Sequence, residues 1–244
     1  MKFANKPIAA VIGAVLISAG AGAARAQEVL GKTKAEWLGV LQKDPKPELR
    51  KAAVIALGIL GPAQKDVLPV LSKALQEDKD ELVRLQVVAT LGSLGRNELK
   101  DLVPTFADVL REDKSAAVRA QTAALFAKLG DAARPALTTL EKALGDMNPQ
   151  VRAAAADAIG RIGPEAKNSI PKLVPLCKDM DVAVRFAVAS SFGRIGDDAL
   201  FALPDLAQML EADASVDVRR GAARSLGLTG TGAGIGRRQH RQLR

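Results

Sequence analysis

The sequence contains few of the residues from which reactive sites are built. Its 244 residues include one cysteine, Cys177, one histidine, His240, and one tryptophan, Trp37, and they include no tyrosine. A single cysteine excludes a disulfide within the chain. One cysteine and one histidine cannot make a usual zinc site, and His240 lies too near the C-terminal end to serve a triad in the body of the chain. We therefore predict no catalytic, cofactor-binding or metal-binding residues, and no cofactor.

Aromatic residues are also scarce. They make up 3% of the sequence, whereas apolar residues as a whole make up 48%. The core must then consist of Ala, Leu, Val and Ile, which suits helices that pack on helices through small contacts. No segment alternates apolar and polar residues as a half-buried strand does. These features predict an all-α protein.

Acidic residues are absent from both ends, and this makes the net charge of +8 misleading. Residues 1–26 contribute +3 and residues 231–244 contribute +4, which leaves +1 for the body of the chain. A nearly neutral body lacks the basic stripe that nucleic-acid binding requires. A nucleic-acid partner is therefore not expected.

The first 26 residues carry the features of a signal peptide. Two lysines precede an uncharged apolar run over residues 8–24, and the Ala-Arg-Ala at residues 24–26 fits the small-x-small cleavage rule. This predicts an exported bacterial protein, periplasmic or secreted, whose mature chain begins at Gln27 and is not stably inserted in a membrane. The alternative is an uncleaved anchor helix, because the apolar run is close to spanning length.

What the sequence has in abundance is a repeat. Six times it shows an aspartate, five residues, an arginine, ten residues and a glycine, and successive arginines are 34, 35, 33, 33 and 34 residues apart. A fixed period of this size indicates a stack of like units. The aspartate–arginine pairs are Asp44 and Arg50, Asp78 and Arg84, Asp113 and Arg119, Asp146 and Arg152, Asp179 and Arg185, and Asp213 and Arg219. The closing glycines are Gly61, Gly95, Gly130, Gly163, Gly196 and Gly230.

Each unit is predicted to hold two helices. The residues one before and three, seven and ten after each arginine are apolar except for Thr122 and Thr229, and they form one stripe of a second helix, which the closing glycine ends. Residues whose side chains can cap that helix stand four before the arginine: Asp80, Ser115, Asn148, Asp181 and Ser215. First helices are expected at 33–43, 64–77, 98–111, 132–145, 166–178 and 199–211, and the last second helix near 216–228.

The details of the repeat distinguish between helical repeat families. The tetratricopeptide pattern needs an aromatic scaffold and the ankyrin pattern needs Thr-Pro-Leu-His, and both are missing. What remains is a valine before the arginine and a trailing Leu-Gly-x-Leu-Gly, as in Val83-Arg84 with residues 91–95. This pattern resembles the HEAT-repeat family in its short, phycobilisome-lyase-like form. The resemblance covers residues 33–230, and Ala127 departs from it where the other units have glycine.

The resemblance implies a right-handed α-solenoid of about six helix hairpins, with the second helices on the concave face. It also implies that the aspartates and arginines form a ladder of bonds between neighbouring units; the alternative is that these charges form a multivalent binding site. The expected organisation is a signal peptide over 1–26, a solenoid over 27–230 and a flexible Gly/Arg-rich tail over 231–244. For the tail, the alternative is contact with an acidic partner or lipid headgroups.

A stack of this kind offers an extended surface, so we expect a noncatalytic scaffold that binds a partner protein or peptide on its concave face. Lys128, Arg161 and Arg194 stand nine residues after the arginine in consecutive units and predict a basic ridge for an acidic peptide; the alternative is solvated charge. Phe186 is apolar where solvent is expected and is a further candidate contact. The alternative function is a lyase-like factor or enzyme subunit that presents a protein substrate, as some relatives attach bilins.

The ladder generates a test of its own. Arg119→Ala is expected to lower the melting temperature far more than Lys114→Ala, because removing one partner of a buried ion pair strands the other charge at a cost of about 3–5 kcal/mol. Thermal unfolding followed by circular dichroism measures both variants. Small and equal shifts would contradict the ladder.

Overall fold

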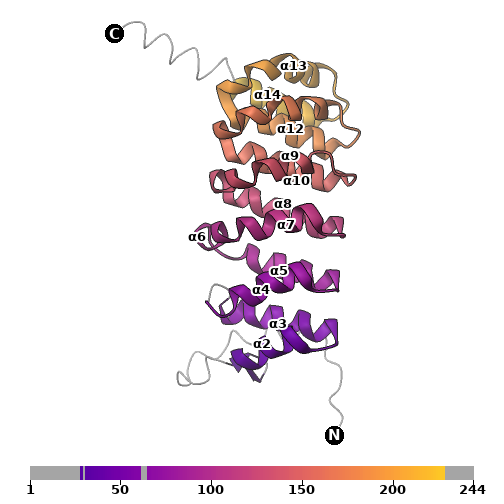
Figure 1. The fold of residues 1–244 in the computed structure, drawn as a ribbon. Helices are drawn as coiled ribbons and strands as arrows, with labels where there is room; N and C mark the ends of the chain where they lie inside the picture. Colours follow the sequence, from indigo (N-terminus) through magenta and orange to yellow (C-terminus); the bar gives the residue numbers. More distant parts are fainter. Residues whose placement is uncertain (1–27, 30, 62–64, 229–244) are drawn as a thin grey trace, which may run out of the picture.

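The computed structural model describes residues 28, 29, 31–61 and 65–228. The prediction of an all-α solenoid is confirmed, because helical hairpins follow one another along a single stack (Figure 1). Two short strands precede the first helix, with β1 Glu28–Val29 antiparallel to β2 Lys32–Thr33. In the described ranges, no helix has the length and apolar character needed to cross a bilayer. The predicted signal peptide, the predicted tail and Gly230 lie outside the described residues.

Each unit contributes a first and a second helix to two parallel layers. The second helices are α3 Pro47–Leu60, α5 Glu81–Gly92, α8 Ala116–Leu129, α10 Pro149–Ile162, α12 Val182–Ile195 and α14 Val216–Leu226. The first helices are α2 Lys34–Lys43, α4 Leu68–Glu77, α7 Val103–Glu112, α9 Leu137–Ala143, α11 Ile170–Leu173 and α13 Leu203–Ala212. Shorter segments precede or follow them: α6 Arg96–Leu99, η2 Lys100–Leu102, η3 Gly130–Ala136, η4 Gly163–Ser169, η5 Val174–Lys178 and η6 Gly196–Ala202.

Several first helices are shorter than the sequence predicted. The expected helix over 166–178 is an α-helix only at α11 and continues as the 3₁₀ segment η5, and the expected helix over 132–145 begins with η3. Prolines are the physical reason, because a proline nitrogen cannot donate to the carbonyl four residues back. Accordingly α7, α11 and α13 each begin one residue before a proline. The segment that directly precedes each of these helices is a 3₁₀ helix.

The ends of the second helices follow the predicted chemistry with two exceptions. Side chains of Asp80, Ser115, Asn148 and Asp181 accept hydrogen bonds from backbone N–H groups of the first turn, whereas Ser215 makes no such bond. Four closing glycines have a positive φ, a conformation that strains residues with a Cβ but not glycine: Gly61, Gly130, Gly163 and Gly196. Gly95 has a φ of −70° because α5 already ends at Gly92, and Gly95 instead precedes α6.

The apolar stripe predicted on the second helices forms the core. The residue before the repeat arginine is fully buried in five units: Val83, Val118, Val151, Val184 and Val218. The exception is Leu49, which is 43% exposed at the N-terminal end of the stack. Burial at this position therefore depends on contact with a preceding unit, as expected where each repeat packs only on its neighbours.

Second helices pack closely on one another along the stack, whereas neighbouring first helices contact each other more sparsely. Closer packing on one side bends a stack toward that side, so the second helices line the concave face. Small residues permit the approach: a Cβ added to Gly160 would lie 2.6 Å from the Cα of Ser191 in the next unit. The Ser191 hydroxyl also donates to the carbonyl oxygen of Ala156 at 2.7 Å.

This close approach predicts the effect of adding one methyl group. Gly160→Ala is expected to lower the free energy of unfolding by about 1–3 kcal/mol, because the methyl meets the backbone of Ser191. The matched control is Gly227→Ala, at the same repeat position of the last unit, where an added Cβ meets nothing within 4 Å. That variant should be unchanged or slightly stabilised, since alanine favours helix over glycine. Urea unfolding distinguishes the two, and equal losses would refute the packing argument.

Candidate partner-binding surface

Ion pairs join every described unit to the next. The repeat arginine donates from Nε and Nη2 to the two carboxylate oxygens of the next unit's aspartate, at 2.6–2.8 Å and 2.7–3.0 Å respectively. Such bidentate pairs fix direction as well as distance. The pairs are Arg50–Asp78, Arg84–Asp113, Arg119–Asp146, Arg152–Asp179 and Arg185–Asp213.

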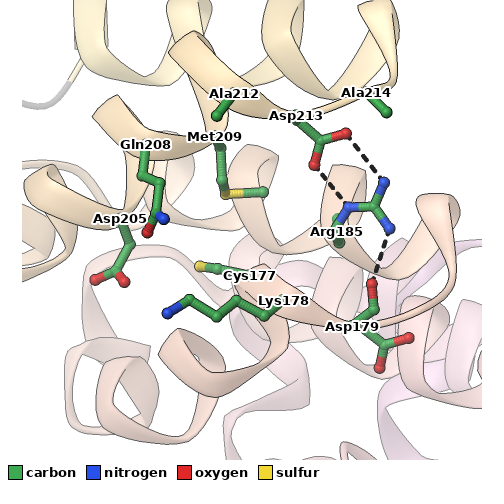
Figure 2. Close-up of a pocket in the computed structure, with 10 residues that line it drawn as sticks. All are labelled: Cys177, Lys178, Asp179, Arg185, Asp205, Gln208, Met209, Ala212, Asp213 and Ala214. Carbon is green, nitrogen blue, oxygen red and sulfur yellow. Dashed lines mark hydrogen bonds and ion pairs between the residues drawn. The ribbon is translucent and has the colours of Figure 1, made fainter.

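The same side chains also bind their own unit. Nη1 of each repeat arginine donates to the backbone carbonyl oxygen of its own unit's aspartate at 2.7–3.0 Å. Each aspartate carboxylate accepts a further bond from the backbone N–H two residues on, at 2.8–2.9 Å. Figure 2 shows the arrangement for Arg185, which lies between the Asp213 carboxylate and the Asp179 carbonyl.

These contacts leave the five paired arginines with little capacity for a partner. All three nitrogen atoms of each guanidinium bond inside the protein, and the paired arginine side chains are only 11–18% exposed. The first aspartate, Asp44, and the last arginine, Arg219, are different, because the structure brings neither to a ladder partner within the described residues. The ladder geometry thus serves contact between units at its interior positions.

The ladder lowers the pKa of four of its carboxyl groups. Hydrogen bonds from Arg119 lower the pKa of Asp146, and those from Arg185 do the same for Asp213, in both cases against the opposing effect of burial. At Asp78 burial is the largest influence and raises the pKa, but the bonds from Arg50 and the backbone outweigh it, so the pKa is still lowered. These aspartates are therefore charged at neutral pH and remain so into acid.

Clefts open between the C-terminal ends of some successive first helices. One cleft of about 310 Å³ lies between η5 and α13, and Arg185 and Asp213 form part of its wall (Figure 2). Another of about 790 Å³ lies between α2 and α4 and includes Arg50 and Asp78. Both clefts lie at the same position in the repeat, where two successive first helices are separated. The arginine in the wall of each cleft is already paired with an aspartate. The clefts therefore offer no free cation from the ladder.

In the described part of the chain, the thiol of Cys177 is not activated and no metal-binding group is assembled. Cys177 lines the smaller cleft, and burial, followed by the charge of Asp205, raises the pKa of its thiol to about 12. The thiolate is the nucleophilic form, so this cysteine is inert at neutral pH. Among residues 28, 29, 31–61 and 65–228, no three His, Cys, Asp or Glu side chains are grouped so that they could hold a metal ion.

The predicted basic ridge is engaged within the protein. Lys128 donates to two backbone carbonyl oxygens at the end of α5 in the preceding unit, at 2.6 and 2.7 Å, where a cation complements the helix dipole. Arg161 and Arg194 share Asp157, at 2.8 and 2.5 Å. Both arginines remain partly exposed. Lys128 and Arg194 thus link neighbouring second helices, whereas Arg161 pairs within its own helix α10, and the three side chains are not a row of free cations.

A second group of residues gathers on the concave face around Phe186. Phe186 is 42% exposed, and its ring lies over Gly221 of the next unit, where an added Cβ would meet the ring at 3.2 Å. Val182 stands four residues before it on α12, and Val216 stands four before Arg220 on α14, so each pair shares a helix face. Val182 and Val216 are 45% and 47% exposed.

We call this group the C-terminal concave patch, and define it as Val182, Phe186, Val216, Arg220 and Arg224. Both arginines are exposed, and the ion pair of Arg220 within the described residues is a distant one with Asp217 at 3.8 Å. Sequence analysis singled out Phe186 but missed the two valines. They stand three residues before the repeat arginine, where earlier units have proline, glutamate or alanine, and that comparison would have identified them.

The repeat region of this chain matches a known protein family. A family model described as HEAT repeats matches residues 34–127, 103–166 and 137–227. Together these matches extend over most of the chain. No curated protein matches it.

Solved structures of similar shape are repeat proteins of low sequence identity. One is an engineered protein, 22% identical over 79% of this chain and 94% of that chain, with a TM-score of 0.59. Another is the complex of CpcE and CpcF of phycocyanin lyase from Nostoc sp. PCC7120, 22% identical over 86% and 79%, with a TM-score of 0.56. A third is a set of computationally designed armadillo repeat proteins for modular peptide recognition, 19% identical over 80% and 98%, with a TM-score of 0.57. At these identities the likeness shows the fold alone.

The lowered pKa values predict that acid weakens the stack. An unfolded aspartate has a pKa of about 3.9, so as the pH falls through that value the unfolded chain takes up protons before the folded chain does. The stability that Asp146 contributes is present above that pH and is lost as the pH falls through the folded-state pKa. The difference in unfolding free energy between the wild type and Asp146→Asn should therefore be larger at pH 7 than at pH 3.

Urea unfolding at the two pH values measures this difference. Asp101→Asn is the control, because Asp101 is exposed on η2 and lies outside the ladder. A gap between wild type and Asp146→Asn that stays constant with pH would contradict the assignment.

Proposed function

This chain belongs to the HEAT-repeat family, and on that premise we propose that it is a noncatalytic scaffold that binds a partner protein or peptide along its concave face. One observation supports the proposal above the others: the C-terminal concave patch combines exposed apolar side chains with exposed arginines. Elsewhere on the second helices the cations of the ladder and of the ridge bond within the protein. Exposed apolar side chains grouped with exposed charged ones are typical of a protein-binding site.

The chemistry of the patch indicates the kind of segment it binds. Phe186 rests on Gly221 and is therefore held in place, so it offers a preformed apolar surface at little entropic cost. Arg220 and Arg224 flank Gly221 in the sequence of the next second helix and are exposed, and arginine side chains suit carboxylates. We infer a peptide with an apolar side chain flanked by acidic residues. Lys128, Arg161 and Arg194 remain a hypothesis for a weaker, second contact zone.

Solved proteins of this fold lend the proposal support by analogy. The designed armadillo repeat proteins are described as made for modular peptide recognition. Their likeness to this chain extends to the fold, and the same layout of second helices is what presents the patch here. Partner identity is a matter for experiment.

Substitution in the patch tests the proposal. Phe186→Ser and the double charge reversal Arg220→Glu, Arg224→Glu are expected to reduce capture of the partner about tenfold or more, because central apolar anchors and their rim charges dominate such contacts. The partner is first identified by cross-linking to the wild type in an extract of the native host. The control is Phe201→Ser, because Phe201 is 89% exposed on η6, outside the second-helix layer. Equal capture by all variants would refute a concave site.

A second candidate is a lyase-like factor or enzyme subunit that presents a protein substrate. Its support is the likeness to the phycocyanin lyase complex, which extends over 86% of this chain but concerns the fold. Because its pKa is raised to about 12, Cys177 is a protonated thiol at neutral pH and does not supply a nucleophile for that candidate. Covalent transfer of a bilin to an apo-phycobiliprotein in the presence of this chain would establish it.

We also propose that the chain is exported to the periplasm or secreted. The support is the charged start, apolar run and small-x-small site within residues 1–26, which lie outside the described residues. Mass spectrometry of the protein from its native host tests this directly. A mature N-terminus at Gln27 in the periplasmic fraction is the expected result, and an intact leader on a cytoplasmic protein would reject it.

A further inference from the structure

The two ends of the described stack carry complementary halves of the ladder. Among the described residues, Asp44 has no arginine of an earlier unit beside it, and Arg219 has no carboxylate at Nε or Nη2. Residues 218–244 contain no aspartate or glutamate, so none of these side chains offers Arg219 a carboxylate. An acceptor site and a donor site of the same kind are thus open at opposite ends.

Asp44 is held as the paired aspartates are. Its φ and ψ are −70° and 131°, and those of Asp78, which is paired, are −65° and 131°. Its carboxylate accepts from the backbone N–H of Lys46 at 2.9 Å, and the carboxylate of Asp78 accepts from Asp80 at the same distance. The Asp44 carboxylate is therefore oriented for an arginine before any arginine is present.

Arg219 is held in the same way as the paired arginines. Its Nη1 donates to the carbonyl oxygens of Asp213 and Ala214 at 2.7 and 3.1 Å. In Arg119 the corresponding distances are 2.8 and 3.3 Å, and there Nε and Nη2 bind the next unit's carboxylate. The anchored Nη1 thus leaves Nε and Nη2 of Arg219 positioned for the carboxylate of a following unit.

The apolar surfaces at the two ends also lack their usual cover. Leu49 is 43% exposed, although the valines at its position are fully buried in units that have a preceding unit. Strand β1 contacts α3, yet it leaves Leu49 near the start of that helix uncovered. At the other end Ala223 is exposed, whereas its counterparts with a following unit are buried: Val54, Val88, Ala123, Ala156 and Ala189. Gly227 likewise faces open space.

From this complementarity we propose that the chain associates head to tail with a second copy of itself. Arg219 of one molecule forms the ladder bond to Asp44 of the next, and the surface around Ala223 and Gly227 covers Leu49. A contact between different surfaces of identical chains leaves one surface of each kind open, so association adds molecules in a row until the row closes into a ring or ends. The contact rests on a partly exposed ion pair and a small apolar area, so it is concentration-dependent and weakened by salt.

Sedimentation velocity of the purified full chain tests the proposal. The weight-average mass of the wild type should rise with concentration at low salt and fall toward that of the monomer at high salt. Asp44→Asn, which keeps the bond to Lys46, and Arg219→Gln should each raise the dissociation constant about tenfold or more. Asp101→Asn, an exposed charge change away from both ends, should leave it unaltered. A wild type that stays monomeric throughout, or variants that associate as the wild type does, would overturn the proposal.

Mixing the two variants separates a specific contact from general stickiness. The Asp44→Asn chain retains a competent C-terminal end, and the Arg219→Gln chain retains a competent N-terminal end. Each alone should be monomeric, while the mixture should form a one-to-one complex and nothing longer. If Arg219→Gln fails to fold by circular dichroism, Ala223→Arg replaces it, because bulk on that exposed helix face blocks the contact and leaves Arg219 intact. A mixture without complex formation would contradict the head-to-tail pairing.

Discussion

Each unit of this protein buries its apolar side only against the units beside it, so the structure depends on how one unit is positioned on the next. The arginine–aspartate ion pair controls that position at every described junction, because it binds the turn of one unit and the carboxylate of the next at once. A largely buried ion pair adds little net stability over apolar residues of the same size, but loss of one partner leaves an uncompensated charge. The ladder therefore specifies the register of the stack more than it strengthens it.

That register brings the second helices close together and decides which surfaces remain for other molecules. Where Gly160 meets Ser191, the helices approach until no methyl group fits between them. Charges on neighbouring second helices are then within reach of one another, and Arg194 of α12 binds Asp157 of α10. Toward the C-terminal end, Arg220 and Arg224 stay exposed on α14, the helix whose Gly221 lies under the Phe186 ring. The surface most suited to a partner thus arises where the internal pairing is least complete.

Sequence analysis anticipated the elements whose structure is set locally and missed those set by competition between local preferences. The second helices, their apolar stripe and most of their caps follow from residue type and spacing. The first helices were predicted too long, because prolines within the segments divert the backbone into 3₁₀ turns that a simple periodicity count overlooks. Gly95 was expected to end a helix, but α5 ends earlier, where the Ser93 hydroxyl bonds to the carbonyl of Thr90. The basic ridge was recognised as a row of charges, but Lys128 binds backbone carbonyls of the preceding unit and Arg194 binds a carboxylate of the preceding unit. Only the partner of Arg161 lies on its own helix, four residues away.

The sequence by itself determined the repeat, the helical class, the apolar stripe and the identity of the ladder residues, because each depends on spacing along one helix or one period of the chain. Only the tertiary structure decided which charges are consumed and which are free, since that depends on distances between residues 27 or more positions apart. It also showed that Asp44 and Arg219 have the geometry of paired residues without a partner among the described residues. Pairing between units is a three-dimensional property, because an arginine meets the aspartate of the next unit only after the two have stacked.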